Sequence, residues 1–268
     1  MTVDLYDGHY ANLELEAQRQ IREETYGEDL GQTSWITLDE YRRFVAWLQL
    51  RPGSRVLDIA CGSGGVAHRM ALDTGAEVVG IDLNEQAIAA ASDRVRNSTL
   101  ASSVTFQVVN AAESLPFPGE SFDALFCNDS INHLPDRERV LRDWNRVLRP
   151  GGRLLYTDPI VVTGSLSNAE IAVRSSIGYY LFVPLGENDR VLREVGLEIV
   201  RVEDATGNVV HTSRRWRAAR DRRQAVLTQF EGKENFEGLQ RFLEVVHALS
   251  SQRRLSRFAF LARTPAIS

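Results

Sequence analysis

The chain is poor in several features that define common protein classes. Its 268 residues include two cysteines, Cys61 and Cys127, which are too few for a disulfide framework. We therefore expect two unlinked thiols and a reducing, cytoplasmic setting. No apolar run approaches the roughly 18 residues of a membrane-spanning helix, so no membrane partner is expected. The first residues also lack the basic flank and apolar run of a secretory signal.

An excess of positive charge is missing as well. The formal net charge is −5 at pH 7, which argues against nucleic acid as a partner, because such binding depends on basic surfaces. Lys233 is the single lysine among 31 basic residues. A codon-composition bias explains this best, and the alternative is arginine retained for forked contacts with anions.

What the sequence does contain, from Arg55 onward, is an alternation of short apolar strands and helices. Near-continuous apolar strands that alternate with helices are typical of a doubly wound α/β fold with a mostly parallel sheet. Such sheets bind ligands beyond the carboxyl ends of their strands. The strands are predicted at 55–60, 77–82, 103–109, 122–128 and 152–158, and the helices at 65–73, 84–97 and 136–149.

The flanking segments follow other patterns. Residues 12–25 are predicted to be helical, and "TLDE" predicts a capping box in which Thr37 caps the next helix and Glu40 reaches back. Beyond Asp158 the pattern predicts an aromatic-rich stretch, two helices over 212–250 broken near "EGKEN", and a last strand, "LSRFAFLAR". These patterns predict an N-terminal helical lid (1–50), a Rossmann-like cofactor-binding core (51–160) and cap insertions with the last two strands (161–268).

The stretch "VLDIACGSGG" predicts a ligand-binding loop after the first strand. Gly62 and Gly64 allow a tight turn and a close approach of the backbone to a ligand. Asp82 ends the second strand and is placed to accept the two hydroxyls of a ribose. Asp58, inside the first strand, has no use beside a pyrophosphate, but it suits a ligand with an ammonium group and no phosphate. The pattern therefore favours S-adenosyl-L-methionine over a dinucleotide, and a dehydrogenase remains a weaker alternative.

Four motifs in order, "VLDIACGSGG", "VVGIDLN", "LPFPGESFDALFCND" and "VLRPGGRLLYTD", resemble those of class I S-adenosylmethionine-dependent methyltransferases over about residues 50–160. The resemblance implies a seven-stranded sheet whose last strand is antiparallel. It also implies cofactor contacts, with the methionine end held at Asp58, Ala60, Gly62 and Gly64, the ribose at Asp82, and the adenine packed on Leu83.

Adenine recognition departs from the family pattern. Many members carry an acidic side chain that contacts the adenine amine, and Ala111 stands in that place. The contact is therefore expected from backbone at Ala111 and Ala112 or from Asn110. Two further residues are expected at the cofactor: Asn128 lines it, and Gln32 closes over it as the corresponding loop does in relatives.

A narrower resemblance, carried by "DSINHL", is to phosphoethanolamine and sarcosine/dimethylglycine N-methyltransferases. It implies a catalytic role for His133 as base or orienter, together with an N-terminal tyrosine, Tyr10 or Tyr6. Asp129 is expected to accept hydrogen bonds from a polar or cationic substrate. Read as ordinary structure, His133 is a capping or packing residue at the start of a helix. Asn132 and Asp136 are interpreted as helix caps.

The substrate pocket is expected to have aromatic walls, since such walls hold cations or flat rings. The arginine-rich segment 214–223 reads as a solvated helix face, with an acidic substrate group as the alternative. The candidate wall residues are Tyr179, Tyr180, Phe182, Trp35 and Trp216.

The sequence therefore predicts an enzyme that methylates a small molecule, most readily at nitrogen. Methylation at oxygen or carbon is the first alternative, and a cofactor-binding module without catalysis is the second. No metal is expected, and a homo-oligomer is compatible with the sequence.

Overall fold

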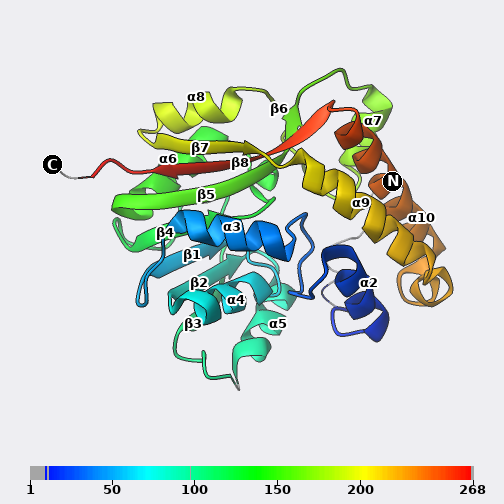
Figure 1. The fold of residues 1–268 in the computed structure, drawn as a ribbon, viewed down its shortest axis with the longest axis horizontal. Coiled ribbons are helices and arrows are strands. Elements are labelled where there is room, and N and C mark those ends of the chain that lie inside the picture. The colour runs from blue at the N-terminus through cyan, green and yellow to red at the C-terminus, as the bar shows by residue number, and fades with distance from the viewer. Residues whose placement is uncertain (1–9, 11, 97, 267–268) are drawn as a thin grey trace.

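A computed structural model of the chain describes residues 10, 12–96 and 98–266. Its centre is a sheet with the order β3-β2-β1-β4-β5-β8-β7 (Figure 1). The strands from β3 to β5 are parallel to one another, and β8 runs antiparallel to both β5 and β7. The strands are β1 (Arg55–Ile59), β2 (Glu77–Asp82), β3 (Val104–Val108), β4 (Phe122–Cys127), β5 (Leu148–Val162), β7 (Glu198–Asp204) and β8 (Leu255–Arg263).

The predicted doubly wound fold is confirmed. A two-residue strand, β6 (Val183–Pro184), pairs with the far end of β5 and makes an eighth strand beyond the seven predicted. Because β5 continues to Val162, the predicted boundary at residue 160 falls inside a strand.

Helices cover both faces of the sheet, as its apolar strands require. One face packs against α3 (Leu38–Leu48), α4 (Gly65–Thr74) and α5 (Glu85–Arg96). The other packs against α6 (Arg137–Val147) and α8 (Glu187–Glu194), with Trp144 of α6 fully buried. Since α3 belongs to the cover of the sheet, we propose that the N-terminal lid ends before it.

A helical cap lies at one end of the sheet (Figure 1). It consists of α2 (Glu16–Tyr26), α7 (Asn168–Arg174), α9 (Thr206–Asp221) and α10 (Gln224–Ser251). Its core includes Ile21, Trp216 and Phe242, so segments far apart in the sequence bury one another. The predicted break near "EGKEN" is confirmed, because Gly232 has non-helical backbone angles and interrupts α10 there. A second break, at residues 222–223, separates α9 from α10.

The arginines of 214–223 do not form a uniformly solvated face. Arg220 is buried and pairs with Glu231, while Arg222 and Arg223 both pair with Glu24 of α2. These ion pairs join the cap helices to one another, which sequence periodicity alone does not reveal.

The predicted capping box is wrong. Thr37 stands at the N-terminal cap of α3, but its side chain makes no capping hydrogen bond. Glu40 turns inward and pairs with the buried Arg257 of β8, at 2.7 Å between Oε2 and Nη1. A buried cation needs a counter-charge, and this demand outweighs a local cap.

Candidate active site

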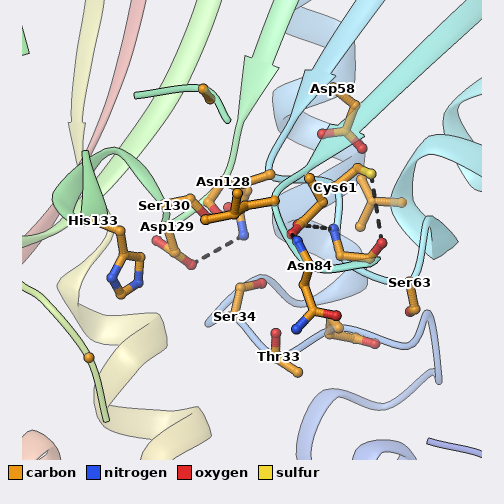
Figure 2. Close-up of a pocket in the computed structure, with 18 of the residues that line it drawn as sticks. Thr33, Ser34, Asp58, Cys61, Ser63, Asn84, Asn128, Asp129, Ser130 and His133 are labelled. Atoms are coloured by element: carbon orange, nitrogen blue, oxygen red, sulfur yellow. Dashed lines mark hydrogen bonds between the residues drawn. The ribbon is translucent and has the colours of Figure 1, made fainter. Parts of the chain in front are cut away.

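A cavity of about 660 Å³ opens at the carboxyl ends of β1, β2 and β4. Every predicted cofactor residue except Gly64 lines it, together with His133 and residues of the cap. In the view of Figure 2, Asp129 and Asn128 lie between His133 and the loop that holds Cys61. A volume of this size accommodates two small molecules side by side.

The glycine loop after β1 has the tight geometry that the sequence predicts. Gly62 and Gly64 have φ values of +54° and +71°, in the left-handed region. A Cβ at Gly62 would lie 2.7 Å from the Tyr10 hydroxyl, and one at Gly64 would lie 2.5 Å from Phe106. Ala60, just before the loop, is also left-handed, at φ +56°, and such strain is typical of functional turns.

Asp58 is the clearest sign of a ligand on this side of the cavity. Its side chain is buried, and Oδ2 has no hydrogen-bond partner among the described residues. Burial raises the pKa of the carboxyl to about 8, and the nearby Asp82 adds to the rise. A buried carboxylate without a partner is costly, so the site suits a cationic group that restores its charge.

Asp82, at the end of β2, holds the glycine loop in place through a hydrogen bond. Its Oδ2 accepts a hydrogen bond from Gly62 N at 2.9 Å, and its Oδ1 accepts one from Asn84 N at 2.9 Å. Burial raises the pKa of this carboxyl as well. Leu83, the next residue, is a large apolar side chain that is 66% exposed in the cavity, as expected of a surface awaiting a flat ring.

The turn at residues 110–112 reduces the number of groups that could contact the adenine. Asn110 Oδ1 accepts from Ala112 N at 3.0 Å, and Ala112 O accepts from Arg139. Because these groups are already paired, we propose backbone at Ala111 as the adenine contact.

A loop of residues 28–36, which we name the covering loop, packs on the glycine loop. Ser63 Oγ donates to Gly31 O at 3.0 Å, and a Cβ at Gly65 would lie only 1.7 Å from Leu30 O. Gln32 lines the cavity, but its side chain is engaged within its own loop, with Leu30 N and Glu28 O. We therefore propose that the backbone of the covering loop, and not the Gln32 side chain, closes over the cofactor.

Tyr10 lies on the same side as the glycine loop. Its hydroxyl hydrogen bonds with Thr33 and lies near Asp82, and burial raises its pKa. We propose that it covers the methionine end of the cofactor, because the structure brings it to Gly62. Tyr6 lies outside the described residues.

His133 ends a short 3-10 helix, Ile131–His133, and faces the cavity (Figure 2). Its Nδ1 is 2.8 Å from the carbonyl oxygen of Tyr179. A carbonyl can only accept, so Nδ1 carries the proton and the lone pair lies on Nε2. Burial lowers the pKa of His133 to about 4, and the charge of Arg174 acts in the same direction. The ring is therefore neutral at physiological pH.

Asp129 forms hydrogen bonds within the protein through both carboxylate oxygens, so it is not the substrate acceptor that the sequence predicts. Oδ1 accepts from Arg257 Nε at 2.6 Å and from Thr157 at 2.7 Å. Oδ2 accepts from Trp35 N at 2.9 Å and from Asn128 Nδ2 at 3.2 Å. A carboxylate has about four lone-pair sites, so these contacts leave none for a cationic substrate. Asn128 lines the cavity within the same network, since its Oδ1 accepts from Arg257 Nη2.

Of the two predicted caps, one is confirmed. Asp136 caps α6 by accepting from Arg139 N at 3.2 Å. Asn132 is fully buried, and neither polar atom of its side chain has a hydrogen-bond partner in the described residues, so it is not a cap.

The chain is similar to known methyltransferases. The protein family described as "Methyltransferase domain" matches residues 57–156 of the chain. The 27-O-demethylrifamycin SV methyltransferase of Amycolatopsis mediterranei is 33% identical over 265 residues, covering 94% of this chain and 91% of that protein. The chain belongs to the S-adenosylmethionine-dependent methyltransferases. It is an enzyme of this family, and S-adenosylmethionine is its cofactor.

Two further known proteins are similar to this methyltransferase over most of its length. The sarcosine/dimethylglycine N-methyltransferase of Halorhodospira halochloris is 32% identical over 205 residues, covering 73% of this chain and 70% of that protein. A solved phosphoethanolamine N-methyltransferase 2 of Haemonchus contortus is 24% identical with a TM-score of 0.80, covering 97% of this chain and 60% of that chain. The latter supports the fold alone. These findings confirm the predicted family and set aside the dehydrogenase and non-catalytic alternatives.

Aromatic side chains line the cavity of this methyltransferase, and all but one of the candidate wall residues are among them. Trp35, Trp216, Tyr179 and Tyr180 line the cavity, whereas Phe182 packs in a separate cluster. Sequence analysis missed Phe242 and Arg174, which also line it. Neither carries a local signal, because both come from cap helices that only the tertiary fold brings to the site.

The described part of the methyltransferase has no helix that is both long and apolar enough to cross a membrane. Within the same residues, no group of histidine, cysteine or acidic side chains is arranged to hold a metal ion. Both cysteines are free thiols.

Proposed function

We propose that this methyltransferase methylates an oxygen of a small-molecule acceptor, with His133 as the residue that orients the acceptor hydroxyl and takes its proton. The observation that carries the proposal is the neutral His133 ring, whose Nε2 lone pair is fixed by the contact of Nδ1 with Tyr179. When bound, S-adenosylmethionine supplies a methyl group on a positively charged sulfur that departs as a neutral thioether.

The residues of the cofactor side fit that ligand. The carboxylate of Asp58 pairs with the ammonium group, Asp82 holds the ribose, and the Gly62 turn allows the close approach. Leu83 and the backbone at Ala111 receive the adenine. Rigid placement of two reactants accounts for several kcal/mol of a barrier, up to roughly 7–11 kcal/mol when alignment is good.

His133 then acts on the acceptor. A hydroxyl donates to Nε2, which points a lone pair of the oxygen away from the imidazole, and the proton moves to Nε2 as the oxygen–carbon bond forms. Because a pKa of about 4 makes the imidazole a weak base, much of its effect comes from orientation.

The sequence favoured nitrogen, and the site supports oxygen better. Asp129 offers no open carboxylate to an ammonium acceptor, because its four acceptor positions are already used. The relative that covers most of this chain is named for methylation at oxygen. Nitrogen stays the second candidate, supported by the similarity to a sarcosine/dimethylglycine N-methyltransferase.

The test uses acceptors that differ in one atom. Methyl-labelled S-adenosylmethionine is incubated with the enzyme and with matched hydroxynaphthoate and aminonaphthoate, and the labelled atom of the product is assigned by NMR. Label on the hydroxyl oxygen supports the proposal. Label on the amine, with none on the hydroxyl compound, would overturn it in favour of the second candidate.

A further inference from the structure

Arg174, the last residue of α7, is a buried cation that forms no ion pair with the described residues. The residue is 2% exposed, and its Nε and Nη1 atoms have no hydrogen-bond partner among those residues. The other buried arginines among the described residues each pair with a carboxylate. They are Arg22 with Asp29, Arg137 with Asp158, Arg220 with Glu231, and Arg257 with Asp129 and Glu40.

Two aromatic rings hold the guanidinium in place. Its Cζ lies 4.6 Å from the ring centre of Tyr180 and 4.9 Å from that of Phe242. Such contacts satisfy the faces of the guanidinium, but its N–H groups point outward in its plane and still require acceptors. A buried donor without an acceptor is rare in native proteins and costs free energy, so a structural role in stacking does not account for the residue.

The position of Arg174 assigns it to the acceptor side of the cavity. The residue lines the same cavity as His133, and its charge lowers the pKa of that histidine. The Tyr180 ring that contacts Arg174 also contacts the His133 ring, at 4.6 Å between centroids. The Tyr180 ring is therefore in contact with both Arg174 and the imidazole. In Figure 2, Asp58 lies on the opposite side of the pocket from His133.

We propose that Arg174 binds an anionic oxygen group of the acceptor, such as a carboxylate or a phenolate, carried on an aromatic or apolar skeleton. The guanidinium fork matches two oxygens in one plane, and charge-assisted pairs of this kind are the strong ones. The flat skeleton would lie among Trp35, Trp216 and Phe242. This inference rests on the proposed function for the identity of the acceptor side, and it specifies the chemistry of that acceptor.

The experiment measures binding, without turnover, of a charged and a neutral probe of the same shape. Calorimetric titration of the enzyme saturated with S-adenosylhomocysteine compares naphthoate with naphthamide. The wild-type enzyme should bind naphthoate at least about tenfold more tightly, as expected for one charge-assisted pair. Arg174→Met keeps a flexible stem between Tyr180 and Phe242 but removes the charge, so the preference should fall to about one.

Two further variants serve as controls for the loss of an arginine and for the loss of charge. Arg142→Met removes an exposed arginine of α6 that pairs with Glu138, and it should leave the preference unchanged. Arg174→Lys keeps the charge but loses the fork, and an intermediate preference is expected. Binding of S-adenosylhomocysteine, whose site Arg174 does not touch, reports whether each variant is folded.

Two results would overturn the inference: a wild-type enzyme that does not prefer naphthoate, or a preference that survives in Arg174→Met. Either would leave Arg174 as a stacking residue only. The proposed function fails separately, because label on nitrogen in the product assay contradicts it whatever the probe preference is.

Discussion

Replacing Asp58 by asparagine should remove most of the pH dependence of cofactor binding. The wild-type carboxyl is buried, lacks a partner at Oδ2 and has a pKa raised to about 8 by burial and by Asp82. Pairing with the ammonium group of S-adenosylhomocysteine requires the ionised carboxylate. Binding therefore includes the loss of a proton whenever the solution is more acidic than about pH 8.

The size of the effect follows from that pKa. At pH 7 roughly nine molecules in ten carry a protonated carboxyl, and at pH 6 roughly ninety-nine in a hundred. The affinity for S-adenosylhomocysteine should therefore fall about tenfold for each pH unit below 7. At pH 8, Asp58→Asn should weaken binding by about 10- to 100-fold, since one charge-assisted contact is lost.

The assay is calorimetric titration between pH 5.5 and 8, with methylthioadenosine as the matched ligand. That molecule keeps the nucleoside and the thioether but has no ammonium group, so the ratio of the two affinities isolates Asp58 from Asp82. The ratio should fall with acid in the wild-type enzyme and stay level in Asp58→Asn. A wild-type ratio that does not change over this range would mean that the Asp58 carboxylate does not pair with the ammonium group.

The same substitution has a consequence for stability. The folded-state pKa of Asp58 lies above its ordinary value of 3.8. The protonated carboxyl therefore contributes stability that is fully present below about pH 4 and is lost as pH rises through 8. Ligand-free Asp58→Asn should have a higher Tm than ligand-free wild type at pH 8, and bound S-adenosylhomocysteine should reverse that order.

Two further predictions concern the parts that hold the site together. Arg257→Met leaves the carboxylates of Asp129 and Glu40 buried without a cation, and it should lower the free energy of unfolding by about 3–5 kcal/mol in urea titrations. Arg263→Met, on the same strand but in an exposed pair, is the control and should cost at most about 1 kcal/mol; equal losses would contradict a buried network. Gly65→Ala should displace the covering loop and weaken S-adenosylhomocysteine binding, since its Cβ would meet Leu30 O at 1.7 Å. Gly207→Ala, which has no heavy atom within 4 Å of its Cβ, should bind normally, and an unchanged affinity in both would mean that the loop does not close over the cofactor.

The parts of the site that sequence analysis predicted are local in the chain. Asp58 and Asp82 lie in adjacent strands, and Gly62 follows the first of them at a fixed offset, so their places could be predicted from local patterns. The strands themselves could be predicted from apolar runs bounded by turns, because burial on both faces leaves few other solutions.

The parts that could not be predicted depend on distant pairs. Glu40 has the sequence context of a helix cap, and only the placement of Arg257 on β8 explains why it turns inward. Asp129 has the context of a substrate acceptor, but that same arginine and Trp35 N already use it. Arg174 belongs to no sequence motif, so that its buried N–H groups lack acceptors among the described residues is visible only in three dimensions.

We claim that His133 orients and deprotonates an acceptor hydroxyl, and the ratio of wild-type to His133→Ala single-turnover rates measures this effect. The ratio should be about 10² or more, with the affinity for S-adenosylhomocysteine unchanged. His133→Gln, which can place an amide oxygen near the position of Nε2, should recover part of the loss. Because the pKa of His133 is about 4, the ratio should stay level from pH 8 to pH 5 and fall only near pH 4. Rates close to wild type in both variants, across hydroxyl acceptors that the enzyme methylates, would contradict the claim.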